Sequence, residues 1–282
     1  MPRDMIDKTA VIEKGAIVGK DVKIGPYCVV GAGVKLGDRV ELVSHVVIGG
    51  KTEIGDDCII YPFAAVGIKG QDLKFQDDSE MTGLKIGKRC RVREYATIQS
   101  GTPASKGTKI GDDCQIMVNA HVAHDCQLGN NVILSNLVQL AGHVEIEDFV
   151  IISAMSAVHQ FCHIGCYAFL GALSGTPVDI PPYVIYEGQP ARYRTINKVG
   201  LARHGFTNED MHAIHLVYSE ILEGGASTED LSAKIARVRK KVKDNQHAMN
   251  ALDFIHNRSG RGIIAGQKIG FFSKDEPKGG AK

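Results

Sequence analysis

A six-residue repeat runs through most of the first 170 residues of this 282-residue chain. Its third position is a branched aliphatic residue in three runs, from Ile12 to Val66, from Ile86 to Ile98 and from Ile110 to Leu170. A period of six fits neither an amphipathic helix nor an alternating strand. It fits short strands joined by turns, with three hexads forming one coil of a triangular prism and coils stacked at the inter-strand spacing. We therefore predict a mainly β fold, a parallel β-helix, over residues 1–185.

The repeat also accounts for the cysteines. Six of the seven, all except Cys166, occupy the small first position of a hexad, which points inward. Cysteine packs well as a small apolar residue, so we interpret these six as core residues rather than disulfides or ligands. Free thiols fit a reducing compartment. The chain also has no signal-peptide pattern and no apolar run long enough to span a bilayer, so we expect a cytoplasmic protein without an integral membrane segment.

The repeat is interrupted by an insertion at about residues 67–84 and ends after Leu170. The proline-rich stretch "SGTPVDIPPYVIYEGQPARY" then predicts an extended exit from the prism. From about residue 186 the pattern predicts a small α-helical C-terminal domain, residues 186–282, with capping-box-like helix starts at Thr207 and Ser227 and a loose tail. The net charge of +1 gives no electrostatic case for a nucleic-acid partner.

The stretch "NAHVAHDC", residues 119–126, is the strongest candidate for a functional site. Val122 points inward on the hexad pattern, so His121, His124 and Asp125 lie on the exterior or in the turns. One and two coils further along, Gly142 and Gln160 share the position of His124, beside His143 and His159. We therefore predict a column of three histidines, His124, His143 and His159, on one outer face.

Two kinds of chemistry remain open for these histidines. Zinc requires neutral imidazoles that converge on one point, and trimeric hexapeptide-repeat proteins of the carbonic anhydrase type bind zinc between subunits in this way. His124, His159 and His163 come closest to that spacing. The alternative is a histidine general base oriented by a carboxylate. The adjacent Asp125 would raise the basicity of His124, whereas a metal site gives Asp125 no clear role. We therefore favour the base and expect that no metal or other cofactor is needed.

Several motifs together resemble one family. "IGPYCVVG", "QDLKF", "NAHVAHDC", "LAGHVEIEDF", "AVHQFCHIG" and "DIPPYVI" are similar to the UDP-N-acetylglucosamine O-acyltransferases of lipid A synthesis, from about residue 5 to residue 263. The resemblance implies a left-handed β-helix and a homotrimer with active sites between neighbouring prisms. It also implies transfer of an (R)-3-hydroxyacyl group from acyl carrier protein to the sugar 3-hydroxyl, although the sequence does not distinguish a 3-hydroxyl from a 3-amino acceptor.

The resemblance also implies roles for individual residues. His124 matches the general base, Asp125 the residue that polarises it, and Gly142 the oxyanion donor. The residues that match sugar, nucleotide or phosphate contacts are Asp72, Lys74, His121, His143, His159, Gln160, Asn197 and Arg203. Ala172 stands where a glycine sets acyl length in the family, so we expect a shorter acyl chain. Val199 and His204 replace a Glu and an Arg, which is expected to weaken diphosphate binding or make it pH-dependent.

Overall fold

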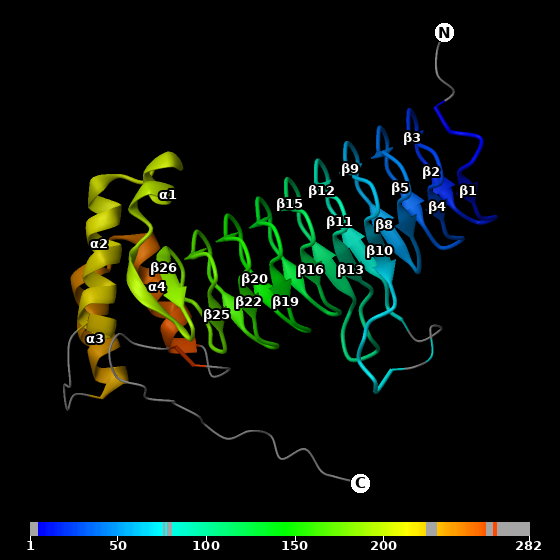
Figure 1. Cartoon of the computed structure of the whole chain (residues 1–282). Coiled ribbons are helices and arrows are strands. Elements are labelled where there is room, and N and C mark those ends of the chain that lie inside the picture. The colour runs from blue at the N-terminus through cyan, green and yellow to red at the C-terminus, as the bar shows by residue number, and fades with distance from the viewer. Residues whose placement is uncertain (1–4, 76, 78–80, 224–229, 258–261, 264–282) are drawn as a thin grey trace.

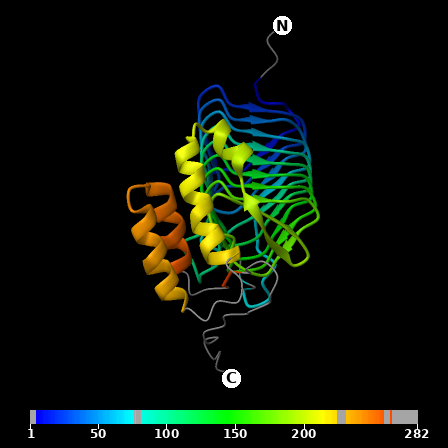
Figure 2. The same cartoon turned by 90° about the vertical axis from the view of Figure 1, so that its left-hand side faces the viewer.

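The computed structural model describes residues 5–75, 77, 81–223, 230–257 and 262–263. It confirms the predicted left-handed parallel β-helix, a triangular prism with helices gathered at its C-terminal end (Figures 1 and 2). Each strand pairs in parallel with the strand one coil further along. Val11 pairs with Val29 and Ile133 with Ile151, an offset of 18 residues. The offset is larger where the loops intervene, 32 residues between Ala65 and Thr97 and 24 between Thr97 and His121. This register determines which side chains lie above one another along the prism.

Within the described residues the strands form three sheets, one on each side of the prism, here named A, B and C. Sheet B contains β1 (Val11–Ile12), β4 (Val29–Val30), β7 (Val47–Ile48), β10 (Ala65–Ile68), β13 (Thr97–Gln99), β16 (His121–Val122), β19 (Gln139–Leu140), β22 (Ala157–Val158) and β25 (Gly175–Thr176). Sheet C contains β2 (Ile17–Val18), β5 (Lys35–Leu36), β8 (Thr52–Ile54), β11 (Leu84–Ile86), β14 (Thr108–Ile110), β17 (Gln127–Leu128), β20 (Glu145–Ile146) and β23 (His163–Ile164). Sheet A contains β3 (Lys23–Ile24), β6 (Glu41–Leu42), β9 (Ile59–Ile60), β12 (Arg91–Val92), β15 (Gln115–Ile116), β18 (Ile133–Leu134), β21 (Ile151–Ile152) and β24 (Phe169–Leu170), extended by β26 (Val184–Gly188) and β27 (Ala191–Ile196).

The predicted inward positions form the core. Every aliphatic residue of the repeat from Ile24 to Leu170 is buried, and the six inward cysteines are completely buried. Ile12 and Val18, in the first coil, are only half-buried. A fully buried aliphatic side chain contributes about 1.5–3 kcal/mol, so the stacked hexads supply most of the hydrophobic stabilisation of the prism.

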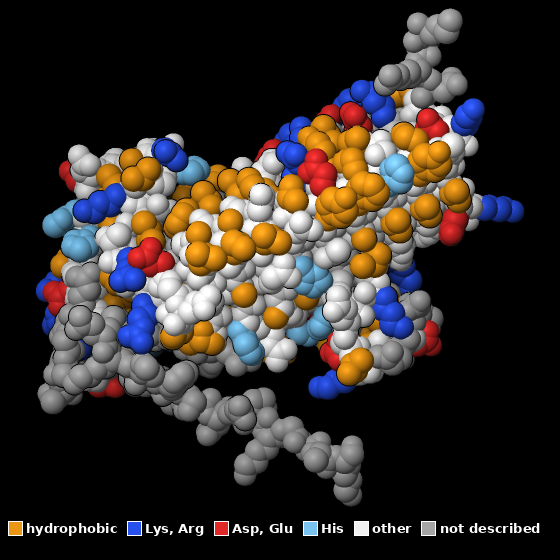
Figure 3. Space-filling view, in the orientation of Figure 1, with side chains coloured by type: hydrophobic (Ala, Val, Ile, Leu, Met, Phe, Trp, Pro, Cys, Tyr) orange, Lys and Arg blue, Asp and Glu red, His pale blue; other side chains and the backbone are white. Residues whose placement is uncertain are grey.

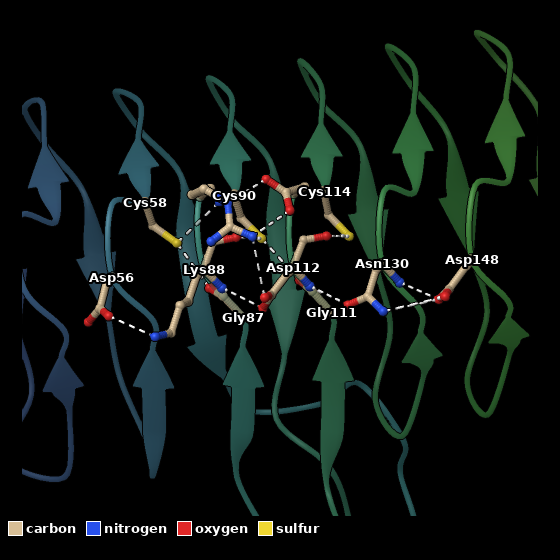
Figure 4. Close-up of polar contacts among 12 residues, drawn as sticks. Asp56, Cys58, Gly87, Lys88, Cys90, Gly111, Asp112, Cys114, Asn130 and Asp148 are labelled. Carbon is tan, nitrogen blue, oxygen red and sulfur yellow. Dashed lines mark hydrogen bonds and ion pairs between the residues drawn. The ribbon is translucent and has the colours of Figure 1, made fainter. Parts of the chain in front are cut away.

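A ladder of polar side chains holds the edge between sheets C and A, here the C/A edge (Figure 4). The carboxylate of Asp112 accepts a hydrogen bond from the backbone N–H of Lys88 at 2.8 Å. The Asn130 side chain accepts one from Asp112 N–H at 2.9 Å, and Asp148 one from Asn130 N–H at 2.6 Å. Each side chain thus satisfies a turn N–H in the preceding coil, which explains the recurrent "GDD" and "GNN" turns.

The C-terminal region departs from the sequence prediction at its start. The expected helical start near residue 186 is wrong, because β26 and β27 continue sheet A as an antiparallel pair. The helices are α1 (Lys198–Arg203), α2 (Asn208–Tyr218), α3 (Leu231–Val242) and α4 (Gln246–Asn257), with a π-helical turn (Ser219–Glu223) after α2. The structure confirms the capping box at Thr207, whereas α3 is capped by Asp230 and Ser227 lies outside the described residues. No described helix is long and apolar enough to cross a bilayer.

Candidate active site

Two loops leave the prism at one edge, between sheets B and C, here the B/C edge (Figure 1). One connects β10 to β11 and the other connects β13 to β14. The turn that contains His124 and Asp125 lies at the same edge, one coil after the second loop. The first loop packs on His124, since a Cβ added at Gly70 would lie 3.2 Å from the Cβ of His124. The second loop, residues 100–107, contacts Asp125.

His124 and Asp125 form a hydrogen-bonded pair. Nδ1 of His124 lies 2.8 Å from Oδ2 of Asp125, whose side chain is fully buried, and the His124 side chain is 13% exposed. An ionised carboxylate only accepts hydrogen bonds, so this contact places a proton on Nδ1. Nε2 of the neutral ring is then left with a lone pair that can accept a proton.

The second loop fixes the carboxylate. Oδ1 of Asp125 accepts from Thr102 N–H at 2.8 Å and from the Ser105 hydroxyl, and Oδ2 accepts from the Thr102 hydroxyl at 2.7 Å. Burial by itself would raise the pKa of Asp125, but the hydrogen bonds from Ser105, His124 and Thr102 outweigh it and hold this pKa below its usual value. Asp125 therefore stays ionised beside His124.

Sequence reasoning missed these supporting residues. Thr102 and Ser105 lie in "SGTPASKG", where the hexad pattern breaks one coil before the histidines. The buried Gln99 also contributes, because its side-chain oxygen accepts from His124 N–H at 3.2 Å. The sequence carried one signal for these residues. The break in the hexad pattern falls at the same edge of the prism as the insertion at 67–84.

The three histidines do not form the predicted column. The 18-residue register places Gly142 above His124, His143 above Asp125, and the exposed His159 above Ala141. His143 nevertheless contacts the pair formed by His124 and Asp125. Its ring is edge-on to the His124 ring, with the centroids 5.2 Å apart, and its Nε2 lies 3.4 Å from Oδ2 of Asp125. Burial lowers the pKa of His143 below 6.5, although the Asp125 charge opposes the shift. His143 is therefore mainly neutral at pH 7.

Gly142 is required by the position of the His124 ring. A Cβ at residue 142 would lie 2.6 Å from Cε1 and 2.8 Å from Nε2 of His124, which is closer than real Cβ contacts allow. Within the described residues the N–H of Gly142 donates to no acceptor. The missing side chain thus makes room for the ring and leaves a backbone donor uncovered near Nε2.

A cavity of about 650 Å³ opens in front of His124. It brings together five of the predicted site residues, from sheet B, the turns at the B/C edge and the first loop: Asp72, Lys74, His121, His124 and Gln160. Nδ1 of His121 lies 2.7 Å from the Thr97 hydroxyl, and burial lowers the pKa of His121, so its ring is a neutral polar group in the wall. In the space-filling view histidines gather beside the loops, midway along the prism (Figure 3).

Three other predicted site residues lie at different edges of the single chain. Asn197 caps α1, accepting from Gly200 N–H at 3.1 Å, and its side chain donates to Tyr167 O at 2.9 Å at the C/A edge. Arg203 is exposed at the end of the same helix. Ala172 is exposed between β24 and β25, at the edge between sheets A and B, here the A/B edge. One chain alone does not bring these residues to His124.

The zinc ligands suggested by the sequence spacing are not close together. His163 lies in sheet C, with its ring nitrogens 3.2 Å from Glu145 and 2.8 Å from Glu147, so the set His124, His159 and His163 is wrong. The group with ligand atoms near one another is instead His124, Asp125 and His143, within 4.8 Å. This group contains two imidazoles and a carboxylate, which are acceptable zinc ligands.

Comparison with known proteins decides the family. Residues 179–264 match the family model described as UDP-N-acetylglucosamine O-acyltransferase, domain 2, and residues 15–50 and 107–142 match the bacterial transferase hexapeptide model. LpxA from Acinetobacter baumannii is 37% identical, with a TM-score of 0.87 over 93% of this chain and 100% of that chain. The chain belongs to the UDP-N-acetylglucosamine O-acyltransferase family.

Other members of this family are similarly close. The UDP-N-acetylglucosamine O-acyltransferase of Moraxella catarrhalis is 36% identical, with a TM-score of 0.86 over 93% of this chain and 100% of that chain. The UDP-N-acetylglucosamine acyltransferase of Francisella novicida is 33% identical, with a TM-score of 0.86 over 92% of this chain and 94% of that chain. Similarity over 92–93% of this chain includes both the prism and the helical region.

The position of His143 predicts a measurable titration. We expect its imidazole to titrate with a midpoint below 6.5, by NMR of histidine-labelled protein with His143→Gln for assignment. Asp125→Asn should lower the midpoint further, because the Asp125 charge is what raises the pKa of His143. Asp72→Asn, which removes a weaker charge effect, should shift it less. A midpoint that rises in Asp125→Asn would contradict the arrangement described.

Proposed function

We propose that this protein transfers an (R)-3-hydroxyacyl group from acyl carrier protein to the 3-hydroxyl of UDP-N-acetylglucosamine, the first step of lipid A synthesis. Membership of the family supports the substrate class. The observation that carries the proposal is the pair formed by His124 and Asp125, with Nδ1 held by a buried carboxylate and the ring in the wall of a large cavity.

The proposed reaction is a direct transfer. Nε2 of His124 takes the proton of the sugar 3-hydroxyl while its oxygen attacks the thioester carbonyl, and Asp125 stabilises the resulting imidazolium. The N–H of Gly142 is the proposed donor to the oxyanion. When the tetrahedral intermediate collapses, the C–S bond breaks and the carrier thiolate takes the proton from His124. No acyl-enzyme is invoked, since Cys126 points into the core and burial raises the pKa of its thiol to about 12.

The cavity suggests how the sugar nucleotide is held. His121 in β16 and Gln160 in the turn after β22 line the cavity from the prism. Asp72 and Lys74 line it from the first loop, where the Asp72 side chain accepts from Lys74 N–H at 2.9 Å. We assign these four residues to sugar and nucleotide contacts. His143 beside the pair, and His159 on the exposed surface further along, are proposed as additional contacts.

A homotrimer would complete the site. Exposed apolar side chains follow the A/B edge, namely Tyr27, Phe63, Tyr95, Leu137, Met155 and Leu173. Apolar side chains line the upper edge of the face seen in Figure 3. If this edge faces a threefold axis, the B/C edge of each prism lies beside the C/A edge of its neighbour. Asn197 and Arg203 of one protomer would then approach the cavity of the next, which suits phosphate binding by Arg203.

The departures at Val199 and His204 bear on this nucleotide contact. Val199 is 65% exposed on α1. Nδ1 of His204 lies 2.8 Å from Gly200 O, and its ring packs edge-on against Phe149 and Tyr167. His204 is thus tied to the helix and carries no permanent charge. Arg203 and Lys198 are then the cations that α1 would offer the diphosphate, and Arg203 has the fork geometry that suits it.

One observation supports a second candidate function, a zinc-dependent hydratase. The group formed by His124, Asp125 and His143 has the ligand types of a zinc site, and a zinc hydratase would use it. We favour transfer without a metal or other cofactor, because Asp125 is already saturated by donors from the second loop. We also propose a cytoplasmic location, which suits the seven free thiols.

One assay tests the function. Protein incubated with UDP-N-acetylglucosamine and a panel of (R)-3-hydroxyacyl carrier proteins should give a sugar nucleotide heavier by one hydroxyacyl group, by mass spectrometry. Activity should survive a chelator, and elemental analysis should show no stoichiometric metal. About one zinc per chain, with activity abolished by the chelator, would favour the hydratase.

The general base has its own test. His124→Ala should lower kcat by roughly 10²–10⁴-fold, the usual contribution of a general base, without changing the oligomeric state by size exclusion. Asp125→Asn should cost less, because it removes orientation and polarisation only. Cys126→Ala is the matched control, two residues away and pointing inward, and it should retain kcat. Near-normal turnover by His124→Ala would end the assignment.

The last prediction from this site concerns the length of the acyl chain that the protein prefers. In the proposed trimer Ala172, exposed at the A/B edge, closes the far end of an acyl groove between prisms. Each misfitting methylene costs about 1–3 kcal/mol, or 10–200-fold in selectivity. Ala172→Gly should therefore shift the preferred donor to longer chains and Ala172→Met to shorter ones, measured as kcat/KM across a carrier series. If both variants keep the parent profile, another residue closes the groove.

A further inference from the structure

A second pocket lies at the B/C edge, on the sheet C side of the two loops. Its volume is about 350 Å³, and four lysines line it: Lys35, Lys51, Lys85 and Lys106. Glu53 is the one acidic residue in this lining. All four lysines are exposed. We name this feature the lysine pocket.

The lysine pocket has an excess of positive charge. Glu53 is shared by two of the lysines, at 2.8 Å from Lys35 and 3.6 Å from Lys85, and the hydrogen bond from Lys35 holds the pKa of Glu53 below its usual value. Lys51 and Lys106 form no ion pair with a described residue. In a chain with a net charge of +1, such a concentration marks a surface suited to an acidic partner.

The pocket is adjacent to the proposed active site. Gly107 and Thr108 form part of its wall. The Thr108 hydroxyl accepts a hydrogen bond from Asp125 N–H at 2.9 Å, and the loop before it holds the Asp125 carboxylate through Thr102 and Ser105. Gly83, at the end of the first loop, lines the pocket as well. A partner seated here would contact both loops that flank His124.

Another basic segment is less available. The run at the end of α3 contains five basic residues, and three of them, Arg237, Arg239 and Lys241, are already paired with carboxylates. Arg237 and Lys241 contact Glu220 at 2.8 and 2.6 Å, and Arg239 contacts Asp253 at 2.6 Å. Most of the positive charge of this run is therefore neutralised within the helical region, which leaves the lysine pocket as the stronger docking surface for an acidic partner.

We propose that the lysine pocket is where the acidic face of the acyl carrier protein docks to deliver its thioester. This inference rests on the proposed function and adds the location of the donor. Charge complementarity identifies the partner, and the shared loop places it one loop away from His124, within reach of a long prosthetic arm. Sheet C also stays open in a trimer whose A/B edges face the axis.

The test compares two donors of the same acyl group. Lys51→Ala/Lys106→Ala should lower kcat/KM for the acyl carrier protein by about tenfold and flatten its dependence on salt, as expected for charges at the rim of an interface. With the small donor acyl-phosphopantetheine, which has no protein surface, kcat/KM should stay within about twofold of the parent. Lys240→Ala/Lys243→Ala is the matched control, with the same loss of charge at the C-terminal end of α3, and it should leave both donors unaffected.

Each other outcome counts against the docking site. An unchanged kcat/KM for the carrier, or an equal loss in the α3 control, would overturn it. An equal loss with both donors would mean that the substitutions disturb the loop around Asp125. Inorganic phosphate that inhibits the parent equally with both donors, but not the double variant, would identify a small-anion site instead. Failure of the proposed function can be told apart from failure of the docking site. If the proposed function is wrong, the unmodified protein forms no product from either donor.

Discussion

The 18-residue register of the coils is the constraint on which the other features depend. Because every coil repeats the same three sides, each outward side chain is placed by its neighbours one coil before and after it. The inward stacks of aliphatic residues and cysteines hold this register, since a shift by one residue would turn the core positions outward. The register alone places Gly142 over His124 and His143 over Asp125. The arrangement of these four residues therefore follows from the stacking of the coils.

At the B/C edge the regular hexad pattern is interrupted, and the candidate catalytic residues lie there. Along the C/A edge a turn needs little more than a ladder of Asp and Asn side chains. At the B/C edge two loops replace such turns and bury a carboxylate among hydroxyl and backbone donors. A buried charge is stable only when its hydrogen bonds are satisfied, and Thr102 and Ser105 satisfy those of Asp125. The same bonds keep His124 oriented toward the cavity.

Sequence periodicity predicted the fold well, because one short rule governs every coil. It identified the core, the inward cysteines and the stretch containing His124 and Asp125. It failed near residue 186, where β26 and β27 extend sheet A and cover its last coil before the helices begin. This strand pair carries no hexad signal, so the sequence pattern could not predict that β26 pairs with β24 at the end of sheet A.

The sequence by itself determined which residues point inward and that His124 stands beside a carboxylate, since both follow from local spacing. Only the tertiary structure decided that His143 lies over Asp125, that His159 and His163 lie apart from the pair, and that Thr102 and Ser105 hold the carboxylate. The physical reason is that loops break the repeat. Within a loop, the spacing of residues along the sequence no longer determines where they lie in the prism. The loop conformation depends instead on hydrogen bonds to residues one coil away.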